Sequence, residues 1–220
     1  MRDVEKAAGF LNLFADNVSA GMDVEPIAWI RENVIDQQSA RSTHIDFTLS
    51  PFLLEPIDKF LNDGTVRHIN LMAPTGSGKS TLFVGLLNYL IANDAGNTLV
   101  AFQNEQETSD FAETRLFPTF RDNKALKNLL PKKRHASRKT EILFPHMNLW
   151  MVSATKGQLQ SKSCRYLIGD EMWAWEKGMV REFLARHHDR FNRKILMVSQ
   201  GGDKGTDWVD EYGKGRIHHY

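Results

Sequence analysis

The sequence predicts an α/β fold, with a central, mainly parallel sheet flanked by helices and preceded by a helical extension at the N-terminus. From residue 68 onward, short apolar runs rich in β-branched residues alternate with amphipathic stretches, which is the pattern of repeated strand–helix–strand units. At residues 71–83, "LMAPTGSGKSTLF", two glycines and a lysine separate the first such strand from the first such helix. A glycine-rich link between a strand and a helix is typical of phosphate binding.

The N-terminal segment is predicted to be helical. Between Asp3 and Ile35, apolar residues recur at helical spacing, and the pattern breaks near "AGMDVEP", which indicates two helices. A further short helix is predicted at 50–61, "SPFLLEPIDKFL", with Ser50 as its N-cap and Pro51 in its first turn.

The remaining elements follow from the alternation of apolar runs and amphipathic stretches. Strands are expected at 68–72 and 98–102 and within 164–171 and 193–200, and helices at 79–93, 109–120, about 177–191 and 205–215. Residues 141–154, "EILFPHMNLWMVSA", indicate a pair of strands joined around Pro145.

The composition is that of a folded protein and restricts its partners. The 220 residues are 41% hydrophobic and 25% charged, which is enough for one sizeable core. A net charge of +1 gives no global attraction to nucleic acid or membranes, so a DNA contact must come from a local patch. The single cysteine, Cys164, fits a reducing compartment, and no run reaches the ~18 apolar residues that span a bilayer. We therefore expect a cytoplasmic protein without membrane contact.

Residues 73–81 carry the phosphate-loop pattern G-x-x-x-x-G-K-[ST], with Ala73 in place of the first glycine. Gly76 and Gly78 allow backbone N–H groups to surround a phosphate where a Cβ would block the approach. Lys79 is expected to reach the β- and γ-phosphates, and Ser80 to place its hydroxyl on Mg²⁺. The alternative is a glycine-rich turn with an accidental lysine. The expected nucleotide-binding residues are Ala73, Pro74, Thr75, Gly76, Ser77, Gly78, Lys79, Ser80 and Thr81.

Two acids end a predicted buried strand, in "YLIGDE". Asp170 and Glu171 would be costly there unless a cation or a reaction used them. With a phosphate loop upstream, Asp170 is expected to hold Mg²⁺, and Glu171 to orient and deprotonate an attacking water. A helix-capping role is the alternative for Asp170.

Around these motifs the chain resembles the large terminase subunit of tailed phages, specifically the lambda-type family. The resemblance covers about residues 45–215 and rests on "FTLSPFLLEPIDKFLNDGTVRHINLMAPTGSGKST", "LWMVSATKGQLQSKSCRYLIGDEMWAW" and "REFLARHHDRFNRKILMVSQGG". It implies a RecA-like P-loop ATPase that uses ATP and Mg²⁺ to drive double-stranded DNA into a procapsid. It also implies a homo-oligomeric ring, a portal protein and a small terminase subunit as partners, and the host cytoplasm as location.

We therefore expect a helical extension at 1–45 and a P-loop ATPase domain at 46–220, without the C-terminal nuclease domain of the family. A superfamily 2 helicase is the alternative, because such enzymes also combine "APTGSGKS" with an Asp-Glu strand. They need a second RecA-like lobe, and only about 50 residues follow Asp170. A binding module without hydrolysis is a third hypothesis, disfavoured because such a module needs no general base such as Glu171.

Further candidates lie outside the two motifs. Ser199 and Gln200 end the last predicted strand and are expected to contact the γ-phosphate and report its loss, unless they form a plain turn. Phe52 is a candidate for stacking on adenine, or else a core residue. Trp173 and Trp175, beside the acidic pair, are expected to be packing residues.

Two groups of basic residues are also candidates. The loop "PKKRHASRK" is either a solvated loop or a DNA-contact surface that reads no sequence, through Lys132, Lys133, Arg134, Arg138 and Lys139. The phosphate loop contains no arginine, although one often stabilises the transition state of phosphoryl transfer. A neighbouring subunit is expected to supply it, from Arg181, Arg186, Arg190 or Arg193.

Overall fold

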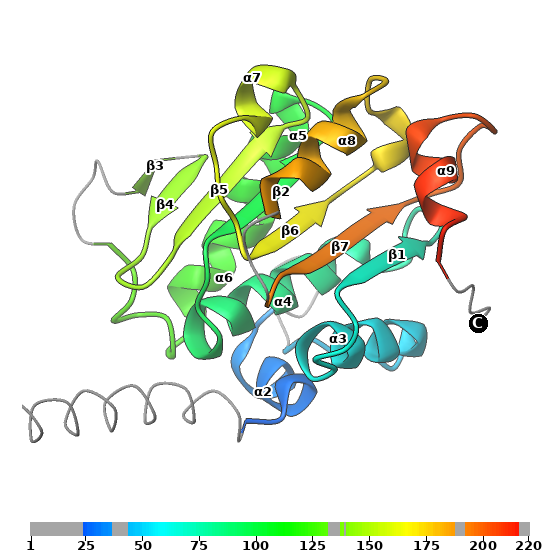
Figure 1. Cartoon of the computed structure of the whole chain (residues 1–220). Coiled ribbons are helices and arrows are strands. Elements are labelled where there is room, and N and C mark those ends of the chain that lie inside the picture. The colour runs from blue at the N-terminus through cyan, green and yellow to red at the C-terminus, as the bar shows by residue number, and fades with distance from the viewer. Residues whose placement is uncertain (1–23, 37–43, 132–136, 139, 188–191, 216–220) are drawn as a thin grey trace, which may run out of the picture.

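The structure, a computed structural model, describes residues 24–36, 44–131, 137–138, 140–187 and 192–215. These residues form a seven-stranded sheet between two layers of helices (Figure 1). In spatial order the strands are β1 (His68–Met72), β7 (Lys194–Ser199), β6 (Tyr166–Gly169), β2 (Thr98–Phe102), β5 (Asn148–Ser153), β4 (Glu141–Leu143) and β3 (Ser137–Arg138).

The first five strands of this order run parallel, β4 pairs antiparallel with β5, and β3 pairs antiparallel with β4. The mainly parallel sheet predicted from the sequence is therefore confirmed. All residues of β2, β6 and β7 are buried, because helices cover both faces of the sheet.

The strand order determines where the site lies. Strand β7 pairs with β1 on one side and with β6 on the other, and all three run in the same direction. The segments that follow these strands therefore meet at the carboxyl edge of the sheet, which is where open α/β sheets bind ligands. These segments are the phosphate loop, the pair Ser199–Gln200 and the pair Asp170–Glu171.

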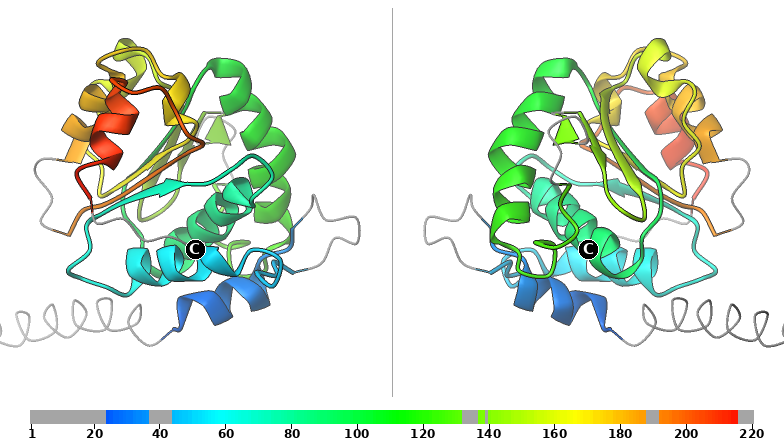
Figure 2. Two further views of the ribbon diagram at one scale, coloured as in Figure 1. Left: turned by 90° about the vertical axis from the view of Figure 1, so that its right-hand side faces the viewer. Right: turned by 90° about the vertical axis from the view of Figure 1, so that its left-hand side faces the viewer.

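The helices divide between the two faces of the sheet, as the side views show (Figure 2). One face carries α2 (Pro26–Asn33), α3 (Leu54–Leu61), α4 (Lys79–Asn93), α5 (Glu105–Asp110) and α6 (Phe117–Asp122). The other face carries α7 (Lys156–Leu159), α8 (Met179–Leu184) and α9 (Asp207–Tyr212).

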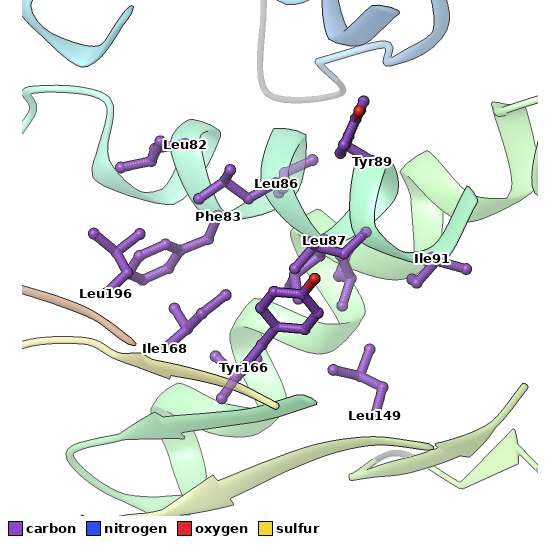
Figure 3. Packing of buried hydrophobic residues seen from close by; sticks show 14 of the residues in the cluster. Leu82, Phe83, Leu86, Leu87, Tyr89, Ile91, Leu149, Tyr166, Ile168 and Leu196 are labelled. Carbon is purple, nitrogen blue, oxygen red and sulfur yellow. The ribbon is translucent and has the colours of Figure 1, made fainter. Parts of the chain in front are cut away.

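Buried side chains form one core on each face of the sheet. Helix α4 contributes many side chains to the larger core, because it lies between the sheet and the N-terminal helices. Its Phe83 and Leu87 point toward Ile168 and Tyr166 of β6 (Figure 3). Each such fully buried side chain contributes about 1.5–3 kcal/mol relative to exposure. The packing anchors the helix whose first residue, Lys79, belongs to the phosphate loop.

Several predicted elements are confirmed with their bounds, and others are corrected. The strands at 68–72 and 98–102 and the helix at 79–93 match β1, β2 and α4, and β4 and β5 form the expected pair around Pro145. The helix expected at 109–120 begins instead at Glu105, because the side chain of Asn104 accepts a 2.9 Å hydrogen bond from the Glu107 N–H.

This helix continues through a π-helical turn, Phe111–Leu116, into α6. Pro118 explains the widened turn, since proline has no N–H and its ring clashes with the carbonyl four residues earlier in a regular α-helix. The helix expected at about 177–191 is shorter than predicted: α8 begins after the left-handed Gly178 and ends at Leu184 in a 3₁₀ turn, and residues 188–191 lie outside the described residues.

At the N-terminal end, the second predicted helix is α2, and the first lies outside the described residues. The expectation that Ser50 caps the next helix is wrong. Its side chain makes no capping hydrogen bond, and the segment starts as a 3₁₀ turn, Pro51–Leu53, before α3. Pro51 does occupy the first turn, as predicted.

Candidate nucleotide site

The phosphate loop joins β1 to α4 and has the backbone conformation that its glycines predict. Gly76 has φ 79° and Gly78 has φ 87°, both in the left-handed region where a side chain is strained. A Cβ at Gly78 would also lie 3.2 Å from a methyl carbon of Leu53. The hydroxyl of Ser77 donates a 2.6 Å hydrogen bond to the Pro74 carbonyl and closes the turn.

Lys79 connects this loop to the acidic pair. Its side chain is largely buried, and its ammonium group donates to the carbonyls of Ala73 at 3.3 Å and Pro74 at 3.1 Å. The same nitrogen lies 3.4 Å from Oε1 of Glu171. The structure thus brings together the lysine and the carboxylate that the sequence predicts to act on a phosphate.

Asp170 directly follows β6, and its environment disfavours a negative charge. Its N–H donates to the Ala101 carbonyl at 2.9 Å, and its carboxylate accepts a 3.0 Å hydrogen bond from the Glu171 N–H. Burial, and then the neighbouring charge of Glu171, raise the pKa of Asp170 to about 7, and Lys79 opposes this shift only in part. A desolvated carboxylate of this kind gains by binding a cation.

The donor atoms suit the ion that the motif implies. Mg²⁺ binds through one or two carboxylates and other hard oxygens, and keeps several waters. Asp170 offers a carboxylate, and Ser80 offers a hydroxyl at the start of α4. These residues fit Mg²⁺ with a nucleotide, and their roles as ligands stay a prediction.

Glu171 is held in an unusual position. Its backbone is left-handed, with φ 46°, a conformation that costs a non-glycine residue on the order of 1–3 kcal/mol. Its Oε2 accepts a 2.8 Å hydrogen bond from the indole Nε1 of Trp173, in the 3₁₀ turn Met172–Ala174. Strained residues of this kind cluster at functional sites, where surrounding contacts maintain them.

The two tryptophans beside the acidic pair differ. Trp175 is a packing residue, as expected, since it is buried and meets Phe183 edge to face with ring centroids 5.3 Å apart. The same expectation is wrong for Trp173, which is 43% exposed. The short 3₁₀ turn brings its ring back beside the carboxylate two residues earlier instead of into the core. The sequence carries no signal for this difference, because the indole N–H of the packing residue Trp175 also has an acceptor here, the Asp170 carbonyl at 2.9 Å.

The tip of β7 touches both motifs. Ser199 is fully buried, and its hydroxyl accepts a 3.0 Å hydrogen bond from the Trp173 N–H, while its carbonyl accepts one of 2.9 Å from the Ala73 N–H. The side-chain oxygen of Gln200 lies 3.3 Å from the Thr75 hydroxyl in the phosphate loop. The sequence did not predict the contact between Gln200 and Thr75.

The remaining candidates are Phe52 and the basic loop. Phe52 is half-buried and packs against the larger core, so its stacking on adenine stays a prediction. Of the basic loop, residues 132–136 and 139 lie outside the described residues, and Arg138 belongs to β3.

The candidate arginines lie on or after α8. Arg181 is exposed at the start of this helix. Arg186 donates to the Glu182 carbonyl at 3.2 Å and lies 3.9 Å from the carboxylate of the same residue. Arg193 directly precedes β7 and therefore lies at the opposite edge of the sheet from the phosphate loop. Arg190 lies outside the described residues.

A separate cavity of about 440 Å³ opens between α5, the end of β5 and α7. Its lining includes Glu105, Trp150, Ser153 and Lys162, and none of the residues of the two motifs. In the described part of the chain, no helix combines the length and the apolar character needed to cross a bilayer.

The comparisons with known proteins agree with this geometry. The family described as "Phage terminase large subunit gpA, ATPase domain" matches residues 39–220. No curated protein matches the chain in sequence.

Solved structures share the fold. The large terminase of bacteriophage HK97 is similar at a TM-score of 0.71 and 16% identity, over 86% of this chain and 40% of that one. The UvsW helicase of bacteriophage T4 is similar at 0.57 and 14% identity, over 93% and 73%. A mutant ATPase domain of the large terminase of Thermus phage P74-26 is similar at 0.54 and 11% identity, over 78% and 74%. These likenesses confirm the RecA-like fold, and the chain spans 40% of the length of the HK97 protein.

Proposed function

Because this chain belongs to the family of ATPase domains of phage terminase large subunits, we propose that it hydrolyses ATP with Mg²⁺ and couples hydrolysis to the movement of double-stranded DNA into a procapsid. The proposal of ATP hydrolysis rests on one observation: Lys79 Nζ lies 3.4 Å from Glu171 Oε1. ATP hydrolysis uses a phosphate-loop lysine on the phosphates and a carboxylate or similar group on the attacking water, and the structure places one of each side by side.

The proposed hydrolysis gives separate roles to Lys79, Glu171 and the pair Ser80 and Asp170. In the structure, the Lys79 ammonium contacts carbonyls of its own loop and the Glu171 carboxylate. When Lys79 turns to a phosphate, Oε1 of Glu171 is released to accept a proton from water. Ser80 and Asp170 would hold the metal, and its positive charge would offset the negative charge of the phosphate oxygens.

The strand tip is suited to report the state of the loop. Gln200 contacts Thr75, and Ser199 is joined to the loop through the Ala73 N–H. A movement of the loop on phosphate release would therefore reach β7 through two hydrogen bonds. This supports the proposed coupling role of Ser199 and Gln200.

We further propose that a ring of subunits completes the site with one of the four candidate arginines. Arg181 is the described candidate that is exposed. Mixing each Arg→Ala variant with a Lys79→Ala subunit tests this proposal. Turnover restored in the mixture supports donation from a neighbour, and full activity of all four single variants contradicts it.

The wider context is proposed on the family alone. The basic residues of 132–139 would contact the phosphates of duplex DNA, and a portal protein and a small terminase subunit would be partners in the host cytoplasm. The division into an extension, 1–45, and an ATPase domain, 46–220, is part of the same proposal. It is supported by the family match, which begins at residue 39.

Measurement of ATP turnover with and without duplex DNA tests the function. We expect Glu171→Gln to retain ATP binding and to lose at least ~10²-fold in turnover, the scale of losing a general base. Loss of binding in this variant would make Glu171 structural. Unwinding of duplex DNA, in place of translocation along it, would favour the helicase alternative.

A further inference from the structure

Trp173 contacts both the proposed base and the tip of β7. Its indole Nε1 donates to Glu171 Oε2 at 2.8 Å, and its backbone N–H donates to the Ser199 hydroxyl at 3.0 Å. Trp173 is nevertheless 43% exposed, unlike the buried Trp175. These two hydrogen bonds therefore help to hold it in position.

We propose that Trp173 is a positioning residue, which holds the Glu171 carboxylate in the orientation that activates water and links that carboxylate to β7. The inference rests on the proposed ATP hydrolysis and adds a residue that the phosphate-loop and acidic motifs do not include.

The two oxygens of Glu171 have different partners. Oε1 faces Lys79 at 3.4 Å, and Oε2 faces the Trp173 indole at 2.8 Å. When Lys79 turns to a phosphate, the indole is the remaining side-chain partner of the carboxylate among the described residues. Without it, a glutamate side chain samples several rotamers, and a displacement of 1 Å at a reacting group costs up to about 10²-fold in rate.

The contacts of Trp173 also close a ring of interactions around the site. From the phosphate loop, the ring runs through the Ala73 N–H to Ser199, and from the Ser199 hydroxyl to Trp173. It continues through the indole to Glu171, and through Lys79 back to the carbonyl of Ala73. A shift of the loop can therefore reach the base by the strand tip as well as by the lysine.

The same chain offers a matched control. Trp150 on β5 donates its indole N–H to Glu141 on β4, also at 2.8 Å. This pair involves none of the residues of the two motifs. Trp150→Phe therefore removes the same kind of hydrogen bond, and the same kind of side chain, away from the nucleotide site.

The first test uses the nucleotide-free protein and needs no activity. In a protein labelled with ¹⁵N-tryptophan, Trp173→Phe identifies the indole N–H resonance of Trp173 by its loss, and Trp150→Phe identifies the control. We expect Glu171→Ala to shift the Trp173 resonance upfield, because its acceptor is gone, and to leave the Trp150 resonance in place. An unmoved Trp173 resonance would overturn the proposed contact.

The second test separates positioning from structure by kinetics. We expect Trp173→Phe to lower kcat by about 10- to 10²-fold with KM and nucleotide affinity within about two-fold, because the ring remains and the donor is lost. Trp173→His, which retains an N–H donor, should recover part of the loss. Trp150→Phe should match the wild type.

A double-mutant cycle completes the test. If Trp173 acts through Glu171, the variant carrying both Glu171→Gln and Trp173→Phe should be no slower than Glu171→Gln alone. Additive losses, or a Trp173→Phe variant with wild-type kcat, would overturn the inference. A wild-type protein that turns over no ATP would overturn the proposed function itself. A normal loss in Glu171→Gln beside an unaffected Trp173→Phe would overturn the inference alone.

Discussion

Buried or half-buried charges lie both where the parallel strands begin, the amino edge of the sheet, and where they end, the carboxyl edge. The partners of these charges differ between the two edges. At the amino edge, Asp94 accepts two hydrogen bonds from the guanidinium of Arg165, at 2.6 and 3.0 Å, and one of 2.6 Å from the Tyr166 hydroxyl. Lys194 donates to the carbonyls of Asp63 at 2.5 Å and Val66 at 2.6 Å. These three charges have short, direct partners within the fold.

At the carboxyl edge the carboxylate of Asp170 has few partners, and the contacts of Lys79 are longer. Among the described residues, the carboxylate of Asp170 accepts a hydrogen bond only from the N–H of Glu171, and burial raises its pKa to about 7. The partners of Lys79 are 3.1 to 3.4 Å away. A buried charge that lacks partners costs stability, and a ligand that provides the missing partners removes this cost. The comparison therefore supports the proposal that the charges of the carboxyl edge bind a nucleotide and those of the amino edge act within the fold.

The largest expected effect follows from removing the cation of the carboxyl edge. We expect Lys79→Ala to reduce ATP turnover to background, because no other side chain of the phosphate loop supplies a positive charge. Turnover is measured on folded protein, with circular dichroism as the control for structure. ATP turnover within a few fold of the wild type would contradict the proposal that the carboxyl edge binds the nucleotide.

A smaller effect is expected in the pH dependence of stability. The pKa of Asp170 is about 7 in the folded chain, against 3.8 for a free aspartate side chain, so the folded state binds this proton more tightly. The contribution of Asp170 to stability is therefore greatest at low pH and falls as pH rises toward 7. Asp170→Asn should remove this fall.

Chemical denaturation of both proteins from pH 5 to pH 8 measures the difference. We expect the wild type to lose roughly 2–3 kcal/mol relative to Asp170→Asn across this range in the absence of Mg²⁺ and nucleotide. His68 acts in the opposite direction, because burial lowers its pKa, and subtracting the variant's profile removes its contribution. Parallel profiles would show that Asp170 is not desolvated as described.

The smallest effect concerns the amino edge. Arg165→Met should destabilise the fold by about 1–3 kcal/mol, because Asp94 loses its guanidinium partner in a half-buried pair that solvent partly screens, and Tyr166 loses the cation 4.7 Å from its ring centroid. Nucleotide affinity of the folded variant should stay within about two-fold. Thermal unfolding measures the loss of stability, and titration calorimetry measures the nucleotide affinity. A variant that loses affinity without losing stability would contradict the structural role of the amino edge.

The sequence was sufficient for the parts of the site that depend on local spacing. Gly78 and Lys79 follow a strand and open a helix, and Asp170 and Glu171 end another strand, so each motif could be located without the fold. That the motifs meet follows from parallel pairing, because carboxyl ends of parallel strands share an edge.

The parts that depend on tertiary contacts were not predictable. Trp173 looked like a packing residue, because nothing in the sequence says that a 3₁₀ turn keeps its ring at the surface beside Glu171. The absence of a cap at Ser50 has a similar cause: the preceding loop enters a 3₁₀ turn first, where the hydroxyl is not directed at the helix N–H groups. The start of α5 at Glu105 depends on a single side chain, Asn104, and the start of α8 at Met179 on the left-handed Gly178.

The most direct test of the assignment compares one lysine from each edge for the stabilisation that ATP with Mg²⁺ confers. A ligand that binds the folded state raises the unfolding temperature by mass action. We predict that Lys194→Met lowers the unfolding temperature of the free chain and keeps the rise caused by ATP with Mg²⁺, and that Lys79→Met loses that rise. A Lys79→Met variant that ATP stabilises as much as the wild type, or a folded Lys194→Met variant that ATP no longer stabilises, would contradict the account.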